Sequence, residues 1–278
     1  MTDRPNPVAV PELAGRLARL LAARPAGLIT DIDGTISRIA PRPEAAVVEP
    51  EARAALARLA RQLELVAAIT GRSAQDAARL VAVPGIVVVG NHGLERLDLA
   101  GLSVADAAQP YLESIGAVMR ELATAPPAPG VVVEHKGASG SIHYRGAPEP
   151  AAARAAILRR LAPLAARHGL RVTEGRMVLE LRPPVAIDKG SALRELVALF
   201  HLRSAVMLGD DVTDVDAMRA LDSLRAEGRL AGCSVGVLAA ETPAELLAAA
   251  DVVIDGVEST VALLQQLARV GGNEEERA

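Results

Sequence analysis

Apolar residues in the first and last thirds of the chain form short continuous runs, which alternate with stretches where they recur every three or four positions. Continuous runs predict buried strands, and the periodic stretches predict helices with one apolar face. The expected strands are residues 26–30, 63–69, 86–89, 205–208, 233–238 and 251–254. The expected helices are residues 11–23, 50–62, 74–80, 189–202, 215–226, 243–250 and 258–269. This alternation predicts an α/β fold with a Rossmann-like, doubly wound parallel sheet.

The middle of the chain has a different pattern. A long helical stretch over residues 104–122 precedes a proline-rich break at 125–130. Two alternating runs at 131–136 and 141–145 predict a hairpin, and a helix over 149–168 leads to a second strand pair at 170–173 and 177–181. Such strands suit a half-exposed antiparallel sheet with helices on one face. We therefore expect an inserted α+β domain at 105–185, between core segments 1–104 and 186–278.

Composition and charge narrow the class of protein. The chain has 278 residues, enough for two domains, and only one Phe, two Tyr and no Trp, so its core must be aliphatic. A net charge of −4 argues against a nucleic-acid binder, and no apolar run approaches the ~20 residues of a membrane helix. The lone Cys233 predicts a buried thiol in a reducing compartment. Because the N-terminal region also lacks a signal-peptide pattern, we expect a cytoplasmic protein. The charged residues 271–278 are expected to fray.

The first strand ends in two carboxylates, Asp31 and Asp33, which are followed by Gly34 and Thr35. If extended geometry continues past the strand end, both side chains lie on one side and repel unless a cation lies between them. A hard divalent cation such as Mg²⁺, which prefers oxygen ligands, meets this need, and a carboxylate can also attack a phosphate as a nucleophile. The alternative interpretation is a strand end with a solvated turn.

Polar motifs follow three further strands, and a lysine begins a later helix. They are Thr70-Gly71-Arg72, Asn91-His92-Gly93, Gly209-Asp210-Asp211-x-x-Asp214 and Lys189. Ligands of doubly wound sheets gather at the carboxyl ends of the strands, so we expect one shared site where a metal, Lys189 and Arg72 neutralise the carboxylates. Taken singly, each motif has a structural explanation as a helix cap, a surface lysine or a satisfied histidine. For His92 the structural role is the favoured interpretation.

The combination of motifs resembles the haloacid dehalogenase-like phosphatases. After residue 25, nearly the whole chain resembles the trehalose-6-phosphate phosphatases within that superfamily. The narrower marks are Asn91-His92-Gly93, Glu134-x-Lys136-Gly137, His143-Tyr144-Arg145 and Gly175-Arg176-x-Val178-x-Glu180. The resemblance implies a haloacid dehalogenase-like core with a cap domain for substrate specificity. It also implies Mg²⁺-dependent hydrolysis of a phosphorylated disaccharide, trehalose 6-phosphate, and a functional link to a trehalose-6-phosphate synthase.

By the same resemblance, Asp31 is the nucleophile that forms a phospho-aspartate. Asp33 first protonates the leaving sugar oxygen and then activates water. Mg²⁺ is held by Asp31, by the backbone carbonyl of Asp33 and by Asp210. Asp214 is a further ligand or lies just behind the ligands, and Asp211 orients Lys189 or a water on the metal. The resemblance implies phosphate binding by Thr70, Gly71, Arg72 and Lys189, and substrate binding by Asn91, His92, Glu134, Lys136, Arg145 and Glu180.

The chemistry of the inserted domain fits this role. Alternate residues Glu134 and Lys136 point to one strand face, which Arg145 can reach from the paired strand, and charged groups select a sugar through its hydroxyls. The alternative is a surface cluster of charges worth little for stability. The chain departs from the family at Val215, where an acidic residue is common, and in its few aromatic residues. Two competing functions stay open: a phosphatase for sucrose phosphate or a glycosylglycerate phosphate, and a catalytically silent sugar-phosphate-binding regulatory module.

Overall fold

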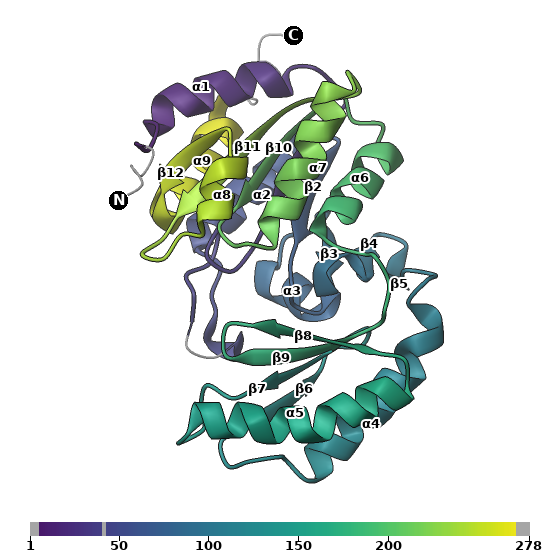
Figure 1. The fold of residues 1–278 in the computed structure, drawn as a ribbon. Helices are drawn as coiled ribbons and strands as arrows, with labels where there is room; N and C mark the ends of the chain where they lie inside the picture. Colours follow the sequence, from purple (N-terminus) through teal and green to yellow (C-terminus); the bar gives the residue numbers. More distant parts are fainter. Residues whose placement is uncertain (1–5, 41–42, 271–278) are drawn as a thin grey trace. The chain divides into compact units, whose positions relative to one another are not determined.

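The computed structural model describes residues 6–40 and 43–270. The chain divides into two compact units, one comprising residues up to Leu102 and from Ile187 onward, and the other comprising Ser103–Ala186. The expected fraying of residues 271–278 lies outside the described residues. Each unit has a sheet and a hydrophobic core of its own (Figure 1).

Within the described residues, the first unit is built on an eight-stranded sheet with the order β12-β11-β10-β1-β2-β3-β4-β5. The strands from β12 to β3 pair in parallel, and β4 runs antiparallel to β3. Their bounds are β1 Ala26–Thr30, β2 Leu65–Ile69, β3 Val87–Gly90, β4 Glu95–Asp98, β5 Gly101–Val104, β10 Ser204–Gly209, β11 Ala231–Leu238 and β12 Val252–Asp255. The expected doubly wound parallel sheet is confirmed.

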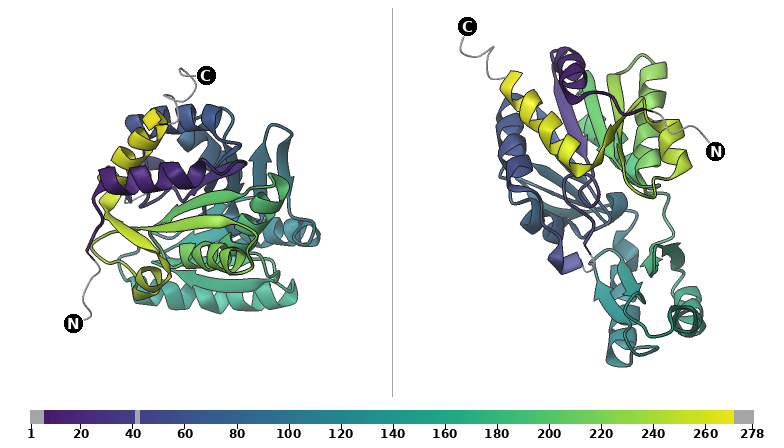
Figure 2. Two further views of the ribbon diagram at one scale, coloured as in Figure 1. Left: turned by 90° about the horizontal axis from the view of Figure 1, so that it is seen from above. Right: turned by 90° about the vertical axis from the view of Figure 1, so that its left-hand side faces the viewer.

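Helices cover both faces of this sheet (Figures 1 and 2). The helices on one face are α1 Val10–Leu21, α2 Pro50–Gln62, α3 Ala74–Val81 and α9 Gly256–Val270; on the other they are α6 Lys189–Leu199, α7 Asp214–Ala226 and α8 Ala244–Ala249. Strands β1 and β2 are buried along their whole length, because apolar side chains on both faces meet a helical layer. The strands therefore read as continuous apolar runs.

The second unit is an antiparallel sheet with helices packed on one face. Its strands have the order β6-β7-β9-β8, with bounds Val132–His135, Gly140–His143, Val178–Arg182 and Arg171–Gly175. The helices are α4 Leu112–Thr124 and α5 Pro150–Arg167. Ile142, Leu179 and Leu181 of the sheet are buried with the apolar residues of both helices. The opposite face of the sheet is left for polar side chains.

One expected element is wrong at its start. The helix predicted from residue 104 begins at Leu112, and the chain before it forms β4, β5 and a short 3-10 turn, η3, at Gln109–Tyr111. Strand β5 is exposed at Gly101–Ser103, with Leu102 and the preceding Leu99 open to solvent. An exposed edge hairpin lacks the continuous apolar run by which a buried strand is recognised, and its few apolar residues fit a helical period by chance.

Two further observations concern membrane-spanning helices and the cysteine. No helix in the described part of the chain is long and apolar enough to cross a membrane. The only cysteine, Cys233, is 2% exposed, as expected from its apolar surroundings. Burial raises the pKa of its thiol to about 11.

Candidate active site

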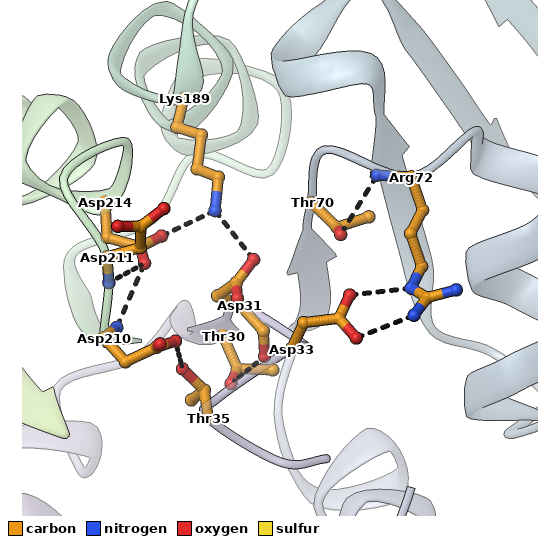
Figure 3. A network of polar contacts seen from close by, with 10 residues as sticks. All are labelled: Thr30, Asp31, Asp33, Thr35, Thr70, Arg72, Lys189, Asp210, Asp211 and Asp214. Atoms are coloured by element: carbon orange, nitrogen blue, oxygen red, sulfur yellow. Dashed lines mark hydrogen bonds and ion pairs between the residues drawn. The ribbon is translucent and has the colours of Figure 1, made fainter. Parts of the chain in front are cut away.

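Strands β1 and β10 are neighbours, so the acidic groups at their carboxyl ends lie together. The two strands pair in parallel with Thr30 opposite Leu208, and the Asp31 amide donates to the carbonyl of Leu208 at 2.9 Å. Asp31 and Asp210 therefore follow the carboxyl ends of two adjacent strands and lie side by side (Figure 3). This is the juxtaposition on which the expected shared site depends.

Lys189 lies between two of the carboxylates. Its Nζ donates to Oδ1 of Asp31 and to Oδ1 of Asp214, each at 2.7 Å, and its side chain is only 3% exposed. Burial alone would lower the pKa of Lys189, but the carboxylates of Asp214 and Asp31 raise it above its ordinary value. Lys189 is therefore a buried, permanently charged cation rather than a surface lysine.

Both carboxylate oxygens of Asp214 accept hydrogen bonds from the protein. While Oδ1 accepts from Lys189, Oδ2 accepts from the backbone amides of Asp210 and Asp211, both at 3.0 Å. Asp214 thus ties the loop after β10 to the first turn of α7. Asp211 is exposed, and no hydrogen bond in the described part of the chain joins it to Lys189. Asp214, rather than Asp211, is hydrogen-bonded to Lys189, and the alternative that Asp211 orients a water on the metal stays a prediction.

Asp210 is held from the opposite side. The hydroxyl of Thr35 donates to its Oδ1 at 2.8 Å, and a Cβ placed on Gly34 would lie 2.0 Å from its Oδ2. Only glycine fits at residue 34, because the backbone there has a φ of +94° and the carboxylate fills the space of a side chain. The Gly-Thr of the first motif therefore serves to seat Asp210 against Asp31.

The donor set suits a divalent cation. One carboxylate oxygen from each of Asp31, Asp210 and Asp214 lies within 4.8 Å of the others, and all three residues are buried. Burial and the neighbouring carboxylates of Asp214 and Asp210 raise the pKa of Asp31, against the lowering effect of Lys189. Burial and Asp214 likewise raise the pKa of Asp210 to about 7. One lysine leaves this cluster with excess negative charge, which a cation among the oxygens would neutralise.

A second cluster lies beside the first and centres on Asp33. The guanidinium of Arg72 forms two hydrogen bonds to its carboxylate, from Nε to Oδ2 and from Nη2 to Oδ1, both at 2.7 Å (Figure 3). The Arg72 amide also donates to the hydroxyl of Thr70 at 3.3 Å. The bidentate pair fixes the orientation of Asp33. The sequence predicted that Arg72 neutralises the carboxylates, but it did not indicate which carboxylate Arg72 pairs with.

Side chains accept hydrogen bonds from two backbone amides in the first turn of α3. Its Ser73 cap accepts from the Asp76 amide at 3.2 Å, and Glu95 accepts from the Ala74 amide at 2.9 Å. Ser73 therefore caps α3, and these two amides already have side-chain acceptors.

Asn91 and His92 lie behind the phosphate motif rather than apart from it. The Asn91 amide donates to the carbonyl of Arg72 at 2.7 Å, and the His92 amide donates to the carbonyl of Thr70 at 2.9 Å. Asn91 is 1% exposed. These backbone bonds attach the end of β3 to the Thr70–Arg72 loop.

In the second unit, the expected substrate residues share one face of the sheet. Glu134 is opposite Ser141, Ser141 is opposite Glu180, and Glu180 is opposite Thr173. Side chains that are directly opposite in an antiparallel sheet point to the same side, away from the helix-facing Ile142 and Leu179. Glu134, Lys136 and Glu180 are thus brought together on the polar face.

These side chains form a polar network. Glu134 contacts Nε2 of His143 at 2.9 Å, Lys136 is 3.8 Å from Glu180, and the Ser141 hydroxyl is 3.4 Å from Glu180. Arg145 is exposed and donates to the carbonyl of Arg176 at 3.3 Å. His143 and Ser141 were not expected in the site. Alternation along β7 could have found them, because both lie an even number of residues from Arg145.

Position 215 lies in an apolar environment. Val215, in the first turn of α7, is 2% exposed and belongs to the apolar cluster formed by α6, α7, α8 and one face of the sheet. An acidic side chain here would need a different local packing.

The chain was compared with known proteins. Residues 29–245 match the family described as trehalose-phosphatase. A trehalose-phosphate phosphatase of Mycobacterium tuberculosis is 41% identical over 212 residues, which cover 72% of this chain and 52% of the relative. The chain therefore spans about half the length of the curated relatives that it matches.

Solved structures show the same fold. The C-terminal domain of Candida albicans trehalose-6-phosphate phosphatase superposes with a TM-score of 0.74 at 19% identity and covers 96% of this chain and 99% of that one. A haloacid dehalogenase-like hydrolase of Bacteroides thetaiotaomicron gives 0.60 at 14% identity, with 90% and 99% covered. The fold is thus haloacid dehalogenase-like, as expected. From the family match over residues 29–245 and the 41% identity to a curated member, the chain belongs to the trehalose-phosphatase family.

Proposed function

We propose that this chain is a Mg²⁺-dependent phosphatase that hydrolyses trehalose 6-phosphate to trehalose and phosphate. Family membership supports the substrate class. The observation that carries the chemistry is a buried cluster: Asp31 and Asp210 follow adjacent strands, and Lys189 and Asp214 begin two helices beside them. A catalytically silent regulatory module has no need of such a set, because each buried carboxylate costs free energy unless it is compensated.

Asp31 is the proposed nucleophile. One of its carboxylate oxygens attacks phosphorus, a new O–P bond forms, and the bond from phosphorus to the sugar oxygen breaks. Asp33 accepts hydrogen bonds from Arg72 at both oxygens, so one of these bonds opens for Asp33 to hold the proton that it gives to the leaving sugar oxygen. In the second half, Asp33 takes a proton from a water molecule that attacks the same phosphorus, so that phosphate leaves and the Asp31 carboxylate returns. Asp33 ends protonated and ready for the next cycle.

The proposed metal ligands are Asp31, the backbone carbonyl of Asp33 and Asp210. Both oxygens of Asp214 already accept hydrogen bonds from protein donors, which favours a holding role for this residue. Bound Mg²⁺ supplies positive charge that allows an anionic phosphate to approach an anionic nucleophile. The carboxylates themselves are kept in place by Thr35 and Lys189.

The proposed phosphate ligands are the Thr70 hydroxyl, Gly71, Arg72 and the Lys189 ammonium. Thr70 and Lys189 come from different strand-to-helix junctions, and Lys189 is fixed by its two carboxylate partners. Because the ammonium is already held in place, it loses little conformational entropy when the phosphate binds, and less of the binding free energy is lost. Arg72 can hold Asp33 and add positive charge at the same place.

We further propose that the second unit selects the sugar, with the polar network of Glu134, Lys136 and Glu180, together with Arg145, binding the hydroxyls. Charged donors and acceptors that must be satisfied discriminate strongly against a substrate that lacks a matching hydroxyl. The support is the register that places Glu134 and Glu180 on one face. Because trehalose 6-phosphate must itself be synthesised, we also propose a functional link to a trehalose-6-phosphate synthase, and a cytoplasmic location.

Substrate choice is tested by phosphate release across a panel of sugar phosphates. For the purified full chain with Mg²⁺, we expect a kcat/KM for trehalose 6-phosphate at least about tenfold above the values for sucrose phosphate, a glycosylglycerate phosphate and glucose 6-phosphate. The reason is that a substrate without a matching hydroxyl loses more than about tenfold in kcat/KM. Equal turnover of all four would defeat the trehalose assignment and leave a general sugar-phosphate phosphatase.

The sugar role of the second unit is tested by Glu134→Ala. We expect kcat/KM for trehalose 6-phosphate to fall by about ten- to a hundredfold, the value of one hydrogen bond to a charged group, while hydrolysis of p-nitrophenyl phosphate is unchanged. Glu174→Ala is the matched control, because Glu174 is a glutamate of the same sheet that pairs instead with Arg154 and Tyr144. Equal losses on both substrates in Glu134→Ala would argue against a sugar contact.

A further inference from the structure

The loop after β3 holds three consecutive residues in the left-handed region. The φ values are 50° at Asn91, 56° at His92 and 111° at Gly93, and we call this segment the left-handed turn. Asn and His carry a Cβ, so this conformation is unfavourable for them and persists only where surrounding contacts enforce it. Strain of this kind, next to a candidate site, calls for an explanation in terms of what the turn contacts.

On one side, the left-handed turn contacts the phosphate loop. The amides of Asn91 and His92 donate to the carbonyls of Arg72 and Thr70 at 2.7 and 2.9 Å. The His92 ring lies over Gly71, where an added Cβ would be 2.7 Å from both Cε1 and Nε2 of the ring. The His92 ring therefore limits how closely the residues between Thr70 and Arg72 can approach the turn.

On the other side, the left-handed turn contacts the segment that carries Lys189. A Cβ placed on Gly93 would be 2.8 Å from Cγ2 of Ile187 and 2.9 Å from the carbonyl oxygen of Asp188. Asp188 caps α6, since its carboxylate accepts from the Ser191 amide at 2.7 Å, and Lys189 follows directly. The turn is thus packed between the Thr70 loop and the start of α6.

We propose that the left-handed turn is a spacer that sets the separation between the Thr70 hydroxyl and the Lys189 ammonium, so that both meet one phosphate. In this role, His92 and Gly93 are positioning residues that do not touch the sugar. The inference rests on the proposed phosphate site and deepens it. It also gives the strain a purpose: the carboxylates of Asp31 and Asp214 hold the Lys189 ammonium, and the turn sets how far from it the Thr70 loop lies.

The test compares two variants with a matched control. His92→Gly removes the ring and the strain together, whereas Gly93→Ala forces a side chain against Ile187 and Asp188. Gly85→Ala is the control, because Gly85 also has a positive φ, +83°, but has no atom within 4 Å of an added Cβ. For each full-length protein with Mg²⁺, we would measure the Kd of inorganic phosphate by calorimetry, kcat and KM for p-nitrophenyl phosphate and for trehalose 6-phosphate, and the melting temperature.

We expect the phosphate Kd to rise about tenfold in His92→Gly and Gly93→Ala, with KM for both esters rising in parallel and kcat falling by up to about a hundredfold. Gly85→Ala should match the wild type in the phosphate Kd and in kcat and KM for both esters, although its melting temperature should be lower, because alanine is strained at a φ of +83°. His92→Gly should keep its melting temperature, which separates positioning from a loss of folding. An unchanged phosphate Kd in both variants would overturn the spacer, as would a His92→Gly variant impaired only toward trehalose 6-phosphate, since that result assigns His92 to the sugar. A wild-type protein that binds phosphate but hydrolyses neither ester would overturn the proposed function. The comparison of phosphate Kd values would still test whether the turn acts as a spacer.

Discussion

An Asp31→Asn variant is expected to lose phosphatase activity by a factor on the order of 10⁴ or more, the scale seen when a covalent nucleophile is removed. An amide oxygen is a poor nucleophile, so the O–P bond to residue 31 cannot form. The remaining ligands can still bind the phosphate, so KM should change far less than kcat. The measurement is phosphate release from p-nitrophenyl phosphate and from trehalose 6-phosphate at saturating Mg²⁺.

The same variant is expected to keep its fold. Asparagine has the shape of aspartate, and its amide oxygen can accept the hydrogen bond that Lys189 now donates to Oδ1 of Asp31. Burial and the nearby carboxylates already disfavour a charge at this position, so a neutral side chain relieves repulsion. Asp106→Asn, at an exposed site in the other unit, is the control for changes unrelated to chemistry. Activity within tenfold of the wild type would remove Asp31 from its assigned role as the nucleophile.

Much of the fold can be predicted from local patterns, because a buried strand or an amphipathic helix is recognisable within a short stretch of sequence. The elements at β1 and α2 begin and end where their apolar patterns do, at Ala26–Thr30 and Pro50–Gln62. Pro50 at the first helical position marks the start of α2, since proline there lacks only an amide hydrogen that the helix does not use. The exposed hairpin of β4 and β5 was not predicted, because its side chains form no continuous apolar run of the kind that indicates a buried strand.

The gathering of carboxylates could be predicted, but their partners could not. Asp31 and Asp210 meet because strands β1 and β10 are neighbours, a consequence of parallel topology. In contrast, the choice of Asp214 over Asp211 as the partner of Lys189 depends on which side chain the turn before α7 directs inward. Arg72 was expected to neutralise the carboxylates, but its choice of Asp33 likewise depends on how far the side chains reach between two loops, which motif spacing does not give.

A Lys189→Met variant is expected to lose about 3–5 kcal/mol of stability and nearly all activity. The methionine keeps most of the volume of the lysine stem, but the ammonium that neutralises Asp31 and Asp214 is gone, and both carboxylates are almost fully buried, at 7% and 0% exposure. Removing one member of a buried ion pair leaves uncompensated charge in a medium that solvates it poorly, and this loss exceeds that of the contact itself. The phosphate also loses its fixed cation.

The double variant Lys189→Met/Asp214→Asn separates the two effects. It removes one of the unpaired carboxylates, and the new amide can still accept from the amides of Asp210 and Asp211. We expect it to regain a large part of the lost stability and none of the activity, because the buried charge is reduced while the phosphate ligand stays absent. Stability is measured by urea unfolding in chelator, so that no bound cation compensates, with alkylation of the buried Cys233 as a second probe of unfolding. A Lys189→Met protein with the wild-type unfolding midpoint, or a double variant less stable than the single one, would show that the Asp31–Lys189–Asp214 contacts do not hold this site together.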